Sequence, residues 1–417
     1  MVRLIAGHVR LILILASVTS LLALTLLLVE IPHNPLAIVG RNLRAARSSR
    51  QGNMVVGPAQ SGHKGILQLS GERPEALADE RDWLAMCQLP NGALAQTPYS
   101  DRVVPYFANI AAKSLIDVDP GAAAKYMVWY LSQLNRPDRW GLSGTIYDYE
   151  VERHGFAAGS EATEIVMIAT RNYDSADSYA ATFLTLVSEY YYKTQDSELV
   201  TANLDDINLV AQVIVSLQDK DGLVFVKPGS RTKYLMDNAE NYRGLIDWSN
   251  ILEELGNSSL AAYYRNVAQR IRNGIAQTLY DSERETFAWS LSPFGKRFPK
   301  KGKWYPDGVS QLYLVTCGVL PPEDPKAIKV WEEFNSQFPG WEFGEKRDRF
   351  PWSSVAIASI IMGDRGKAVQ FAQWAEETFL LNNRPYPWYV LESSNVITLT
   401  ELLAKTGTVL GTSLAER

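Results

Sequence analysis

From about residue 73 to the end of the chain, one amphipathic helical pattern follows another, and this succession is the strongest constraint on the fold. The segment 257–278 shows the pattern most clearly. Apolar residues recur there at spacings of three and four residues, as in Leu260, Tyr264, Val267 and Ile271. Such spacing places the apolar side chains on one face of a helix, which another element must cover. The chain is therefore expected to bury its core between packed helices.

The patterns predict twelve helices, at 75–87, 104–116, 120–134, 175–194, 197–217, 237–255, 257–278, 305–317, 324–337, 350–363, 365–381 and 392–406. Strand-like alternation is rare and short, as in 223–226. Because each helical hairpin needs a neighbour to cover its apolar face, twelve helices in hairpins are expected to close on themselves. We therefore predict an all-α fold, an (α/α)6 toroid or six-hairpin barrel, over residues 73–417.

Two of the predicted hairpins end in similar loops. Residues 88–94 have the sequence Gln-Leu-Pro-Asn-Gly-Ala-Leu, and residues 218–224 have the sequence Gln-Asp-Lys-Asp-Gly-Leu-Val. An Asn-Gly or Asp-Gly pair is common in turns. Its recurrence at corresponding points of two hairpins indicates a weak internal repeat.

The N-terminal end differs in composition from the rest of the chain. Leu11–Val29 is a run of 19 residues without a charge, which is about long enough to cross a bilayer as a helix. Arg3 and Arg10 precede it, so the positive-inside rule places the N-terminus in the cytoplasm and the rest outside. We predict a transmembrane signal anchor at 1–30, in a single-pass inner or plasma membrane protein. The alternative is a cleaved signal peptide, which would give a secreted protein.

Residues 31–72 are predicted to form a linker. They contain Pro32, Pro35 and Gly40, then an Arg-rich patch at 41–50 and further Gly and Ser residues. The helical domain at 73–417 is therefore expected to lie outside the cytoplasm, in the periplasm or at the cell surface.

Charge and composition argue against several classes of function. The net charge is −5 without long charged runs, whereas nucleic-acid binding needs a basic face. Only His154 of the four histidines lies in the predicted domain, which argues against a histidine metal site. No Gly-rich phosphate loop, dinucleotide fingerprint or Cys/His metal spacing is present, so no cofactor is expected. Cys87 and Cys317 could form one disulfide or remain two buried thiols.

Three acidic segments, 173–182, 236–245 and 304–313, each open a predicted helix. In the first two, acidic residues lie three apart and so share one face of the first turn, as in Asp237 and Glu240. A helix-capping role is the simpler explanation for such pairs. However, Tyr and Trp residues crowd the same segments, and the N-termini of inner helices in such a barrel meet at one rim. A capping carboxylate there would also face a pocket.

Five segments resemble the six-hairpin glycosidase superfamily, which includes glucoamylases and trehalases. They are QLPNGALAQTP (88–98), VPYFANIAA (104–112), YDSADSYAATFL (173–184), DNAENYRGLIDW (237–248) and YPDGVSQLY (305–313). The resemblance implies an active site at the N-terminal ends of the inner helices. It implies Asp177, Glu240 and Asp307 as the leading catalytic carboxylates, with Asp174 next, and leaves open which one donates the proton.

Substrate contacts are expected from polar and aromatic residues near the same helix starts. Aromatic rings offer flat apolar faces on which sugar rings can pack, and Arg243 could bind a substrate carboxylate. The candidates are Tyr173, Tyr179, Asp237, Arg243, Trp304, Tyr305, Gln311, Asp348, Trp352 and Trp388.

The sequence therefore predicts a glycoside hydrolase that acts on a polysaccharide or oligosaccharide outside the cytoplasm. An inverting mechanism would need two carboxyl groups roughly 6.5–9.5 Å apart. The alternative is a non-catalytic carbohydrate-binding component of a membrane-anchored exopolysaccharide assembly or export system, with polysaccharide-machinery proteins as partners. A sugar epimerase would be expected to use paired histidines. A polysaccharide lyase would use Tyr with a basic partner, and the predicted acidic rim would repel a polyuronate.

Overall fold

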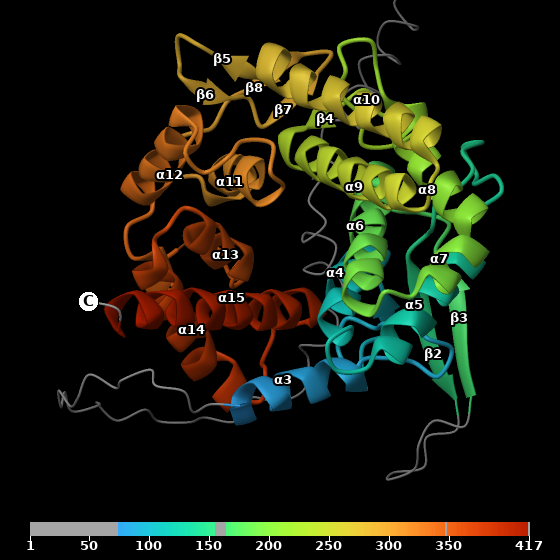
Figure 1. Ribbon diagram of the computed structural model, residues 1–417, viewed down its shortest axis with the longest axis horizontal. Coiled ribbons are helices and arrows are strands. Elements are labelled where there is room, and N and C mark those ends of the chain that lie inside the picture. Colours follow the sequence, from blue (N-terminus) through green and yellow to red (C-terminus); the bar gives the residue numbers. More distant parts are fainter. Residues whose placement is uncertain (1–73, 155–163, 347, 416–417) are drawn as a thin grey trace, which may run out of the picture. The chain divides into compact units, whose positions relative to one another are not determined.

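In the part of the chain that the structure describes, twelve helices of eight or more residues alternate between an inner barrel and an outer layer (Figure 1). They belong to a computed structural model that describes residues 74–154, 164–346 and 348–415. The inner helices are α4 (Pro105–Leu115), α6 (Ala176–Thr194), α9 (Leu235–Glu254), α11 (Val309–Thr316), α13 (Ser353–Ile361) and α15 (Val390–Ala415). The outer helices are α3 (Pro74–Met86), α5 (Pro120–Ser132), α8 (Leu204–Leu217), α10 (Ser258–Gly274), α12 (Pro325–Gln337) and α14 (Arg365–Thr378).

The inner helices form a closed circuit. Each contacts the next inner helix along the chain, and α15 returns to contact α4. At this last junction the hydroxyl groups of Ser114 and Ser394 lie 2.7 Å apart, and Ser394 also bonds the carbonyl oxygen of Ile110 at 2.7 Å. The predicted helix-rich fold is confirmed, and the closed alternation of inner and outer helices matches the six-hairpin arrangement.

The core lies between the two layers of helices. The aromatic rings of Tyr130 on α5 and Phe183 on α6 stack with centroids 3.9 Å apart and planes 9° apart. Trp248 on α9 and Tyr264 on α10 are fully buried in the same way between an inner and an outer helix. This burial of large side chains supplies most of the driving force for the pairing of layers.

Shorter helices interrupt the pattern. The predicted helix at 197–217 is divided into α7 (Ser197–Ala202) and α8, because the chain bends at Asn203. The others are the π-helical turns η2 (Ile275–Leu279) and η3 (Trp304–Gly308) and the 3₁₀ turns η4 (Trp341–Phe343) and η5 (Leu380–Asn382). In η3 the backbone of Tyr305 is extended, so the chain kinks just before α11.

Within the described residues, three small antiparallel sheets lie in the connections, which the all-α prediction omitted. They contain β1 (Arg102–Val103), β2 (Tyr149–His154) and β3 (Glu164–Ala169); β4 (Lys233–Tyr234), β7 (Ser290–Ser292) and β8 (Gly295–Arg297); and β5 (Tyr280–Asp281) with β6 (Thr286–Phe287). The β2–β3 ladder runs from Tyr149 opposite Ala169 to His154 opposite Glu164. In contrast, the alternating segment 223–226 forms only an isolated bridge.

The two similar loops at 88–94 and 218–224 have the same conformation, so the internal repeat is confirmed. In each loop the first and last residues form an antiparallel bridge. The glutamine that opens each loop donates from Nε2 to two carbonyl oxygens, one in its own loop and one in the next outer helix. The acceptors are Gly92 and Ala122 for Gln88, and Gly222 and Val267 for Gln218.

Three glycines allow these connections to pack directly on a neighbouring outer helix. Gly92, Gly144 and Gly222 have φ values of 100°, 88° and 86°. A Cβ atom at these positions would lie 2.6, 2.2 and 2.2 Å from the carbonyl oxygens of Lys125, Leu209 and Arg270 on the next outer helix. Each position therefore needs glycine both for its backbone conformation and for the close approach.

The predicted anchor at 1–30 and the predicted linker at 31–72 lie outside the described residues. Within the part of the chain that the structure describes, no helix is both long and apolar enough to span a membrane. Cys87 and Cys317 are both buried free thiols, so they do not form a disulfide.

Candidate active site

Outer helices α5, α12 and α14 begin differently from the inner helices, although outer helices α8 and α10 lack a capping side-chain bond as the inner helices do. Outer helices α5, α12 and α14 each start with an aspartate, Asp119, Asp324 or Asp364, whose carboxylate accepts a hydrogen bond from a backbone N–H of the first turn. Inner helices α4, α6, α9, α11 and α13 have no such bond from their own N-cap side chain. We call the end of the barrel where the inner helices begin the mouth. Polar side chains at the mouth are therefore available for contacts other than capping their own helix.

Two acids at the mouth share one hydroxyl group. Ser175, which precedes α6, lies with Oγ 2.7 Å from Asp177 Oδ1 and 3.1 Å from Asp237 Oδ2. Asn241 on α9 donates to Asp177 Oδ2 at 2.8 Å. Asp177 and Asp237 are thus held together across the α6–α9 contact, and the capping-box interpretation of Asp237 with Glu240 is wrong.

Glu240 lies one turn deeper along α9. Its Oε1 accepts a hydrogen bond of 2.6 Å from the hydroxyl of Tyr106, at the start of α4. Tyr313 on α11 lies close to both groups. Burial, followed by the charge of Glu240, raises the pKa of its hydroxyl, and a hydrogen bond with Tyr106 acts in the opposite direction. Glu240 therefore faces the interior of the barrel, among side chains of three inner helices.

Burial and mutual repulsion favour the protonated forms of these acids. Burial raises the pKa of Asp177 to about 7, although hydrogen bonds from Ser175 and Asn241 act in the opposite direction. Burial, followed by the charge of Asp237, raises the pKa of Glu240 to about 8. Burial and the charges of Asp177 and Asp174 raise the pKa of Asp237 well above its usual range. The mouth can therefore hold carboxylic acids that keep a proton near neutral pH, which proton donation requires.

Asp174 and Asp148 extend the cluster toward solvent, and both are half-buried. The Tyr179 hydroxyl donates to Asp148 Oδ1 at 2.8 Å. Burial raises the pKa of Asp148 to about 7, and the charge of Asp174 acts in the same direction. Asp174 also raises the pKa of Asp237, so it faces the same space.

Aromatic side chains form a wall beside the acids. The rings of Tyr305 and Trp352, from the starts of α11 and α13, lie 4.7 Å apart at 31°. Burial and the charge of Asp237 raise the pKa of the Tyr305 hydroxyl, which places this tyrosine next to the acid cluster. Trp352 is held in a left-handed backbone conformation, with φ of 61°. This wall could provide a flat apolar face for a sugar ring.

Glu392, at the start of α15, binds the start of α13. Its carboxylate accepts hydrogen bonds from the backbone N–H groups of Trp352 and Ser353 and from the Ser353 hydroxyl, at 3.2, 2.9 and 2.6 Å. It therefore supplies the cap that α13 lacks, and burial raises its pKa. This position was signalled in the sequence, because Glu392 opens the last predicted helix.

The third acidic segment does not bring its carboxylate to the cluster. Asp307 accepts a hydrogen bond from the Lys300 backbone N–H at 2.9 Å and lies 3.3 Å from Lys303 Nζ. Trp304 packs between Phe334 and Phe338, at centroid distances of 5.2 and 5.1 Å. Both residues thus fix the connection before α11, and Tyr305 between them is the one that reaches the acids.

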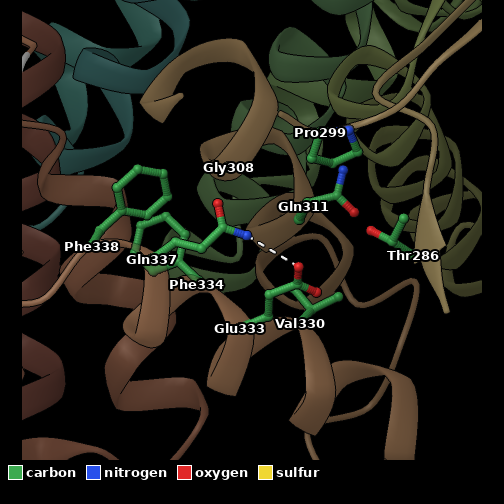
Figure 2. A pocket seen from close by; sticks show the side chains of 9 residues that line it. All are labelled: Thr286, Pro299, Gly308, Gln311, Val330, Glu333, Phe334, Gln337 and Phe338. Carbon is green, nitrogen blue, oxygen red and sulfur yellow. Dashed lines mark hydrogen bonds between the residues drawn. The ribbon is translucent and has the colours of Figure 1, made fainter. Parts of the chain in front are cut away.

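Gln311 faces the outer layer rather than the mouth. Its Nε2 donates to the carbonyl oxygen of Phe287 at 3.1 Å. Figure 2 shows Gln311 among the residues that line a small cavity between α11 and α12, together with Phe334 and Phe338. None of the described acids of the α6–α9 cluster lines this cavity.

Four other predicted contacts lie outside the cluster. Buried Tyr173 donates a hydrogen bond to Asp138 at 2.6 Å, and the Trp388 indole donates to Glu80 at 2.9 Å. Arg243 forms an ion pair with Asp247 at 2.6 Å, further along α9. Asp348 accepts a hydrogen bond from the Phe350 backbone N–H at 2.9 Å. Tyr173 and Trp388 thus serve the packing of connections. Arg243 is partly exposed, at the level of Cys317.

Sequence reasoning missed several members of the site. Ser175 and Asn241 belong to the two acidic segments, so their proximity could have been suspected from the predicted helix starts. Tyr106 lies in the segment 104–112, but nothing in that segment distinguishes it from a tyrosine of the core. Asp148 lies in the long connection between α5 and α6, and no pattern in the sequence marks it.

A closed barrel of six helical hairpins, with carboxyl groups at the end where the inner helices begin, is an arrangement found in glycosidases. No protein-family model matches the sequence, and no curated protein matches it. Solved structures do match its fold. A glycosidase in complex with glucose is 12% identical, with a TM-score of 0.57, and the match covers 79% of this chain and 96% of that one.

Two further glycosidases match the fold of this chain at similarly low sequence identity. The GH63 mannosylglycerate hydrolase from Thermus thermophilus is 13% identical, with a TM-score of 0.55 and coverage of 78% of this chain and 99% of that one. The GH78 rhamnosidase of Bacillus sp. GL1 is 10% identical, with a TM-score of 0.51 and coverage of 78% and 34%. The chain therefore has the fold of the six-hairpin glycosidases.

Among the described residues, no group of three His, Cys, Asp or Glu side chains could hold a metal ion.

Proposed function

We propose that this protein is a glycoside hydrolase whose active site is the acid cluster at the starts of α6 and α9. The observation that carries the proposal is the meeting of three buried carboxyl groups, Asp177, Asp237 and Glu240, at one mouth of the barrel. Burial raises the pKa of each of them. Glycoside hydrolysis needs one protonated and one ionised carboxyl group beside the scissile bond. The fold shared with known glycosidases supports the same assignment.

Asp237 is the proposed proton donor. It is the third residue of α9, near the opening of the mouth, and 5% of it is exposed. Burial favours its protonated form and raises its pKa, and the neighbouring charges of Asp177 and Asp174 act in the same direction. A carboxylic acid in this state can donate its proton to the leaving oxygen of a glycoside.

Asp177 is proposed to position Asp237 rather than to act on the sugar. The facing oxygens of the two acids bond the same hydroxyl, so they lie closer than the sum of 2.7 and 3.1 Å. This is shorter than the roughly 6.5–9.5 Å that leaves room for the water of an inverting mechanism. Asp177 is also fully buried. Asp174, which is half-buried and interacts with Asp237, is the proposed ionised partner.

The test is hydrolysis by the full-length chain of a panel of glycans, measured as release of reducing ends. Asp237→Asn keeps the shape of the side chain and removes its titrating group. We expect it to lower kcat by about 10²–10⁴-fold, because the step loses its general acid. Asp174→Asn should also lower kcat.

Asp205→Asn, at an exposed position on the outer helix α8, is the matched control and should leave activity unchanged. Circular dichroism will show that each variant keeps its helices. Full activity in the Asp237→Asn variant would contradict the assignment, and binding of glycans without turnover by the parent would favour a carbohydrate-binding role instead.

We also propose that the reaction takes place outside the cytoplasm. The uncharged segment Leu11–Val29, preceded by Arg3 and Arg10, supports an N-terminal membrane anchor with the barrel on the far side. Protease protection of a reporter fused at each end, in intact and permeabilised cells, tests this arrangement.

A further inference from the structure

A basic segment borders the mouth between α9 and α11. From Thr286 to Pro306 the sequence contains five basic residues and no acidic one. They are Lys296, Arg297, Lys300, Lys301 and Lys303, and all five are exposed. Strand β8 is exposed along its whole length, and the segment continues directly into η3 and α11. We call residues 296–303 the basic rim.

The basic rim is joined to the acid cluster through the backbone. Strands β4, β7 and β8 form one sheet, and β4 leads directly into α9 (Figure 1). The Trp289 N–H donates to the carbonyl oxygen of Arg297 at 2.9 Å, and the Trp289 carbonyl accepts from the N–H of Leu235, the first residue of α9, at 3.0 Å. Asp237 lies two residues further along α9. The backbone of Arg297 is thus two hydrogen bonds away from the start of the helix that carries the proposed proton donor.

Aromatic rings connect the two charged regions. Trp289 and Tyr234 lie parallel, with planes 3° apart and centroids separated by 6.3 Å. Arg297 Cζ and Lys303 Nζ each lie 5.9 Å from the centroid of the Trp289 ring. On the other side, the charges of Asp237 and Asp174 raise the pKa of the Tyr234 hydroxyl, in addition to the larger effect of its burial. A path of flat apolar faces thus runs from the acids to the cations.

Most of the rim cations are not neutralised by the protein. Lys303 lies 3.3 Å from Asp307. Within the described residues, Lys296, Arg297, Lys300 and Lys301 form no ion pair. Unpaired, exposed cations beside a site create a positive potential that attracts an anionic ligand. Meanwhile the raised pKa values of Asp177 and Glu240 reduce the negative charge of the inner cluster near neutral pH.

We infer that the substrate is an anionic polysaccharide, with carboxylate or sulfate groups that bind the basic rim while the scissile bond lies at the acid cluster. The inference rests on the proposed function in taking a carbohydrate as the ligand. The Trp289 and Tyr234 rings would pack against the sugar units between the two regions. The buried acids Asp177, Asp237 and Glu240 lie inside the mouth, and the exposed basic rim lies outside it, so an anionic polymer would meet the cations first.

Binding by the full-length chain is measured with polygalacturonate, with the same polymer after reduction of its carboxyl groups, and with heparin. We expect polygalacturonate, heparin or both to bind at least about tenfold more tightly than the reduced polymer, with affinity that falls as salt increases. The carboxylate and sulfate polymers show which anion the rim prefers. Equal binding of charged and reduced polymers, insensitive to salt, would overturn the inference.

The rim is tested with Arg297→Gln combined with Lys301→Gln, which should weaken binding of the anionic polymer by about tenfold. Arg270→Gln combined with Lys405→Gln removes the same charge from exposed sites on α10 and α15 and should have no effect. An equal loss in both double variants would show only a net-charge effect and contradict the inference.

Hydrolysis is followed separately, so that the two proposals can fail independently. Rim-dependent binding of an anionic glycan without turnover would sustain the inference and overturn the proposed function. Turnover of neutral glycans with no preference for charged ones would support the proposed function and overturn the inference of an anionic substrate. Rim-dependent binding to vesicles of anionic phospholipid, with no binding to any anionic glycan, would assign the basic rim to a membrane surface and overturn the inference.

Discussion

The carboxyl groups at the mouth are arranged so that loss of a proton is unfavourable. Asp177 accepts hydrogen bonds at both oxygens, yet its complete burial still raises its pKa to about 7. Burial, followed by the charge of Asp237, raises the pKa of Glu240 to about 8, although the hydrogen bond from Tyr106 acts in the opposite direction. Both groups have pKa values of about 4 in an unfolded chain. Folding is therefore coupled to proton binding at these two positions.

The free energy of unfolding should decrease as the pH rises from about 4 to about 8. Over this range the native chain retains protons at Asp177 and Glu240 that the unfolded chain has released. Their stabilising contribution to the native state is therefore complete below the pKa of the unfolded chain, and it is lost as the pH rises through the pKa of the folded chain. Urea unfolding at a series of pH values measures the slope. Glu240→Gln should flatten it, and the exposed Asp205→Asn should not. A slope that the Glu240→Gln variant leaves unchanged would show that Glu240 titrates normally.

At this scale the sequence predicted the types of residue better than their partners. The acidic helix starts of α6 and α9 were identified, and the structure brings Asp174, Asp177, Asp237 and Glu240 together. The same pattern at Asp307 leads to a different outcome, because Lys300 and Lys303 bind that carboxylate locally. A helix start fixes where a side chain begins, whereas its partner depends on loops whose path the sequence does not reveal.

At the scale of elements, the outer layer is tied together by loops that need glycine. Gly222 has a φ of 86°, and a Cβ atom there would lie 2.2 Å from the carbonyl oxygen of Arg270 on α10. Gly229 has a φ of 75°, but no atom lies within 4 Å of its Cβ position. The two glycines therefore separate the effect of backbone conformation from that of close packing.

Gly222→Ala should destabilise the fold by about 2–4 kcal/mol, because both the left-handed backbone and the contact with α10 resist a side chain. Gly229→Ala should cost only about 1 kcal/mol, from the backbone conformation alone. Chemical denaturation of both variants measures the difference. Equal effects would mean that the α8 connection moves away from α10 without cost.

The helices were predictable because their apolar periodicity is long and regular. The small sheets were not, since β1, β4, β5 and β6 contain two residues each and have too few positions to show alternation. The longer β2–β3 hairpin was also missed. In β2, buried Tyr149 and Val151 do alternate with exposed Glu150 and Glu152, but only over four residues. In β3 the apolar residues fall on both faces, and none of them is fully buried, so no alternation marks the strand.

At the scale of the whole barrel, the first outer helix is fastened to the connection before the last inner helix. Glu80 on α3 is fully buried and accepts from Arg384 at 2.7 Å and from Trp388 at 2.9 Å. A second pair, Arg81 with Glu401 at 2.6 Å, joins α3 to α15 with about a quarter of each side chain exposed. The sequence patterns predicted that the helical hairpins close on themselves. They did not predict these contacts of α3, because the contacts join residues that lie about 300 positions apart in the chain.

Glu80→Ala should destabilise the protein by about 3–5 kcal/mol, because it leaves the largely buried Arg384 without a counter-charge. Glu401→Ala removes the more exposed pair and should cost about 1 kcal/mol or less. Urea unfolding monitored by circular dichroism compares the two variants. If both changes cost the same, the buried pair is not a fastening of the barrel.

The contrast between helix starts has a consequence for the order in which the molecule assembles. An outer helix such as α12 carries its own cap in Asp324, whereas α13 obtains its cap from Glu392 on another hairpin. The self-capped outer helices α5, α12 and α14 can therefore form from local sequence, but the start of α13 acquires its cap only after the circuit closes. By the same logic, mild denaturant should disorganise the mouth before it melts the helices. Activity would then be lost while the far-ultraviolet spectrum is still native.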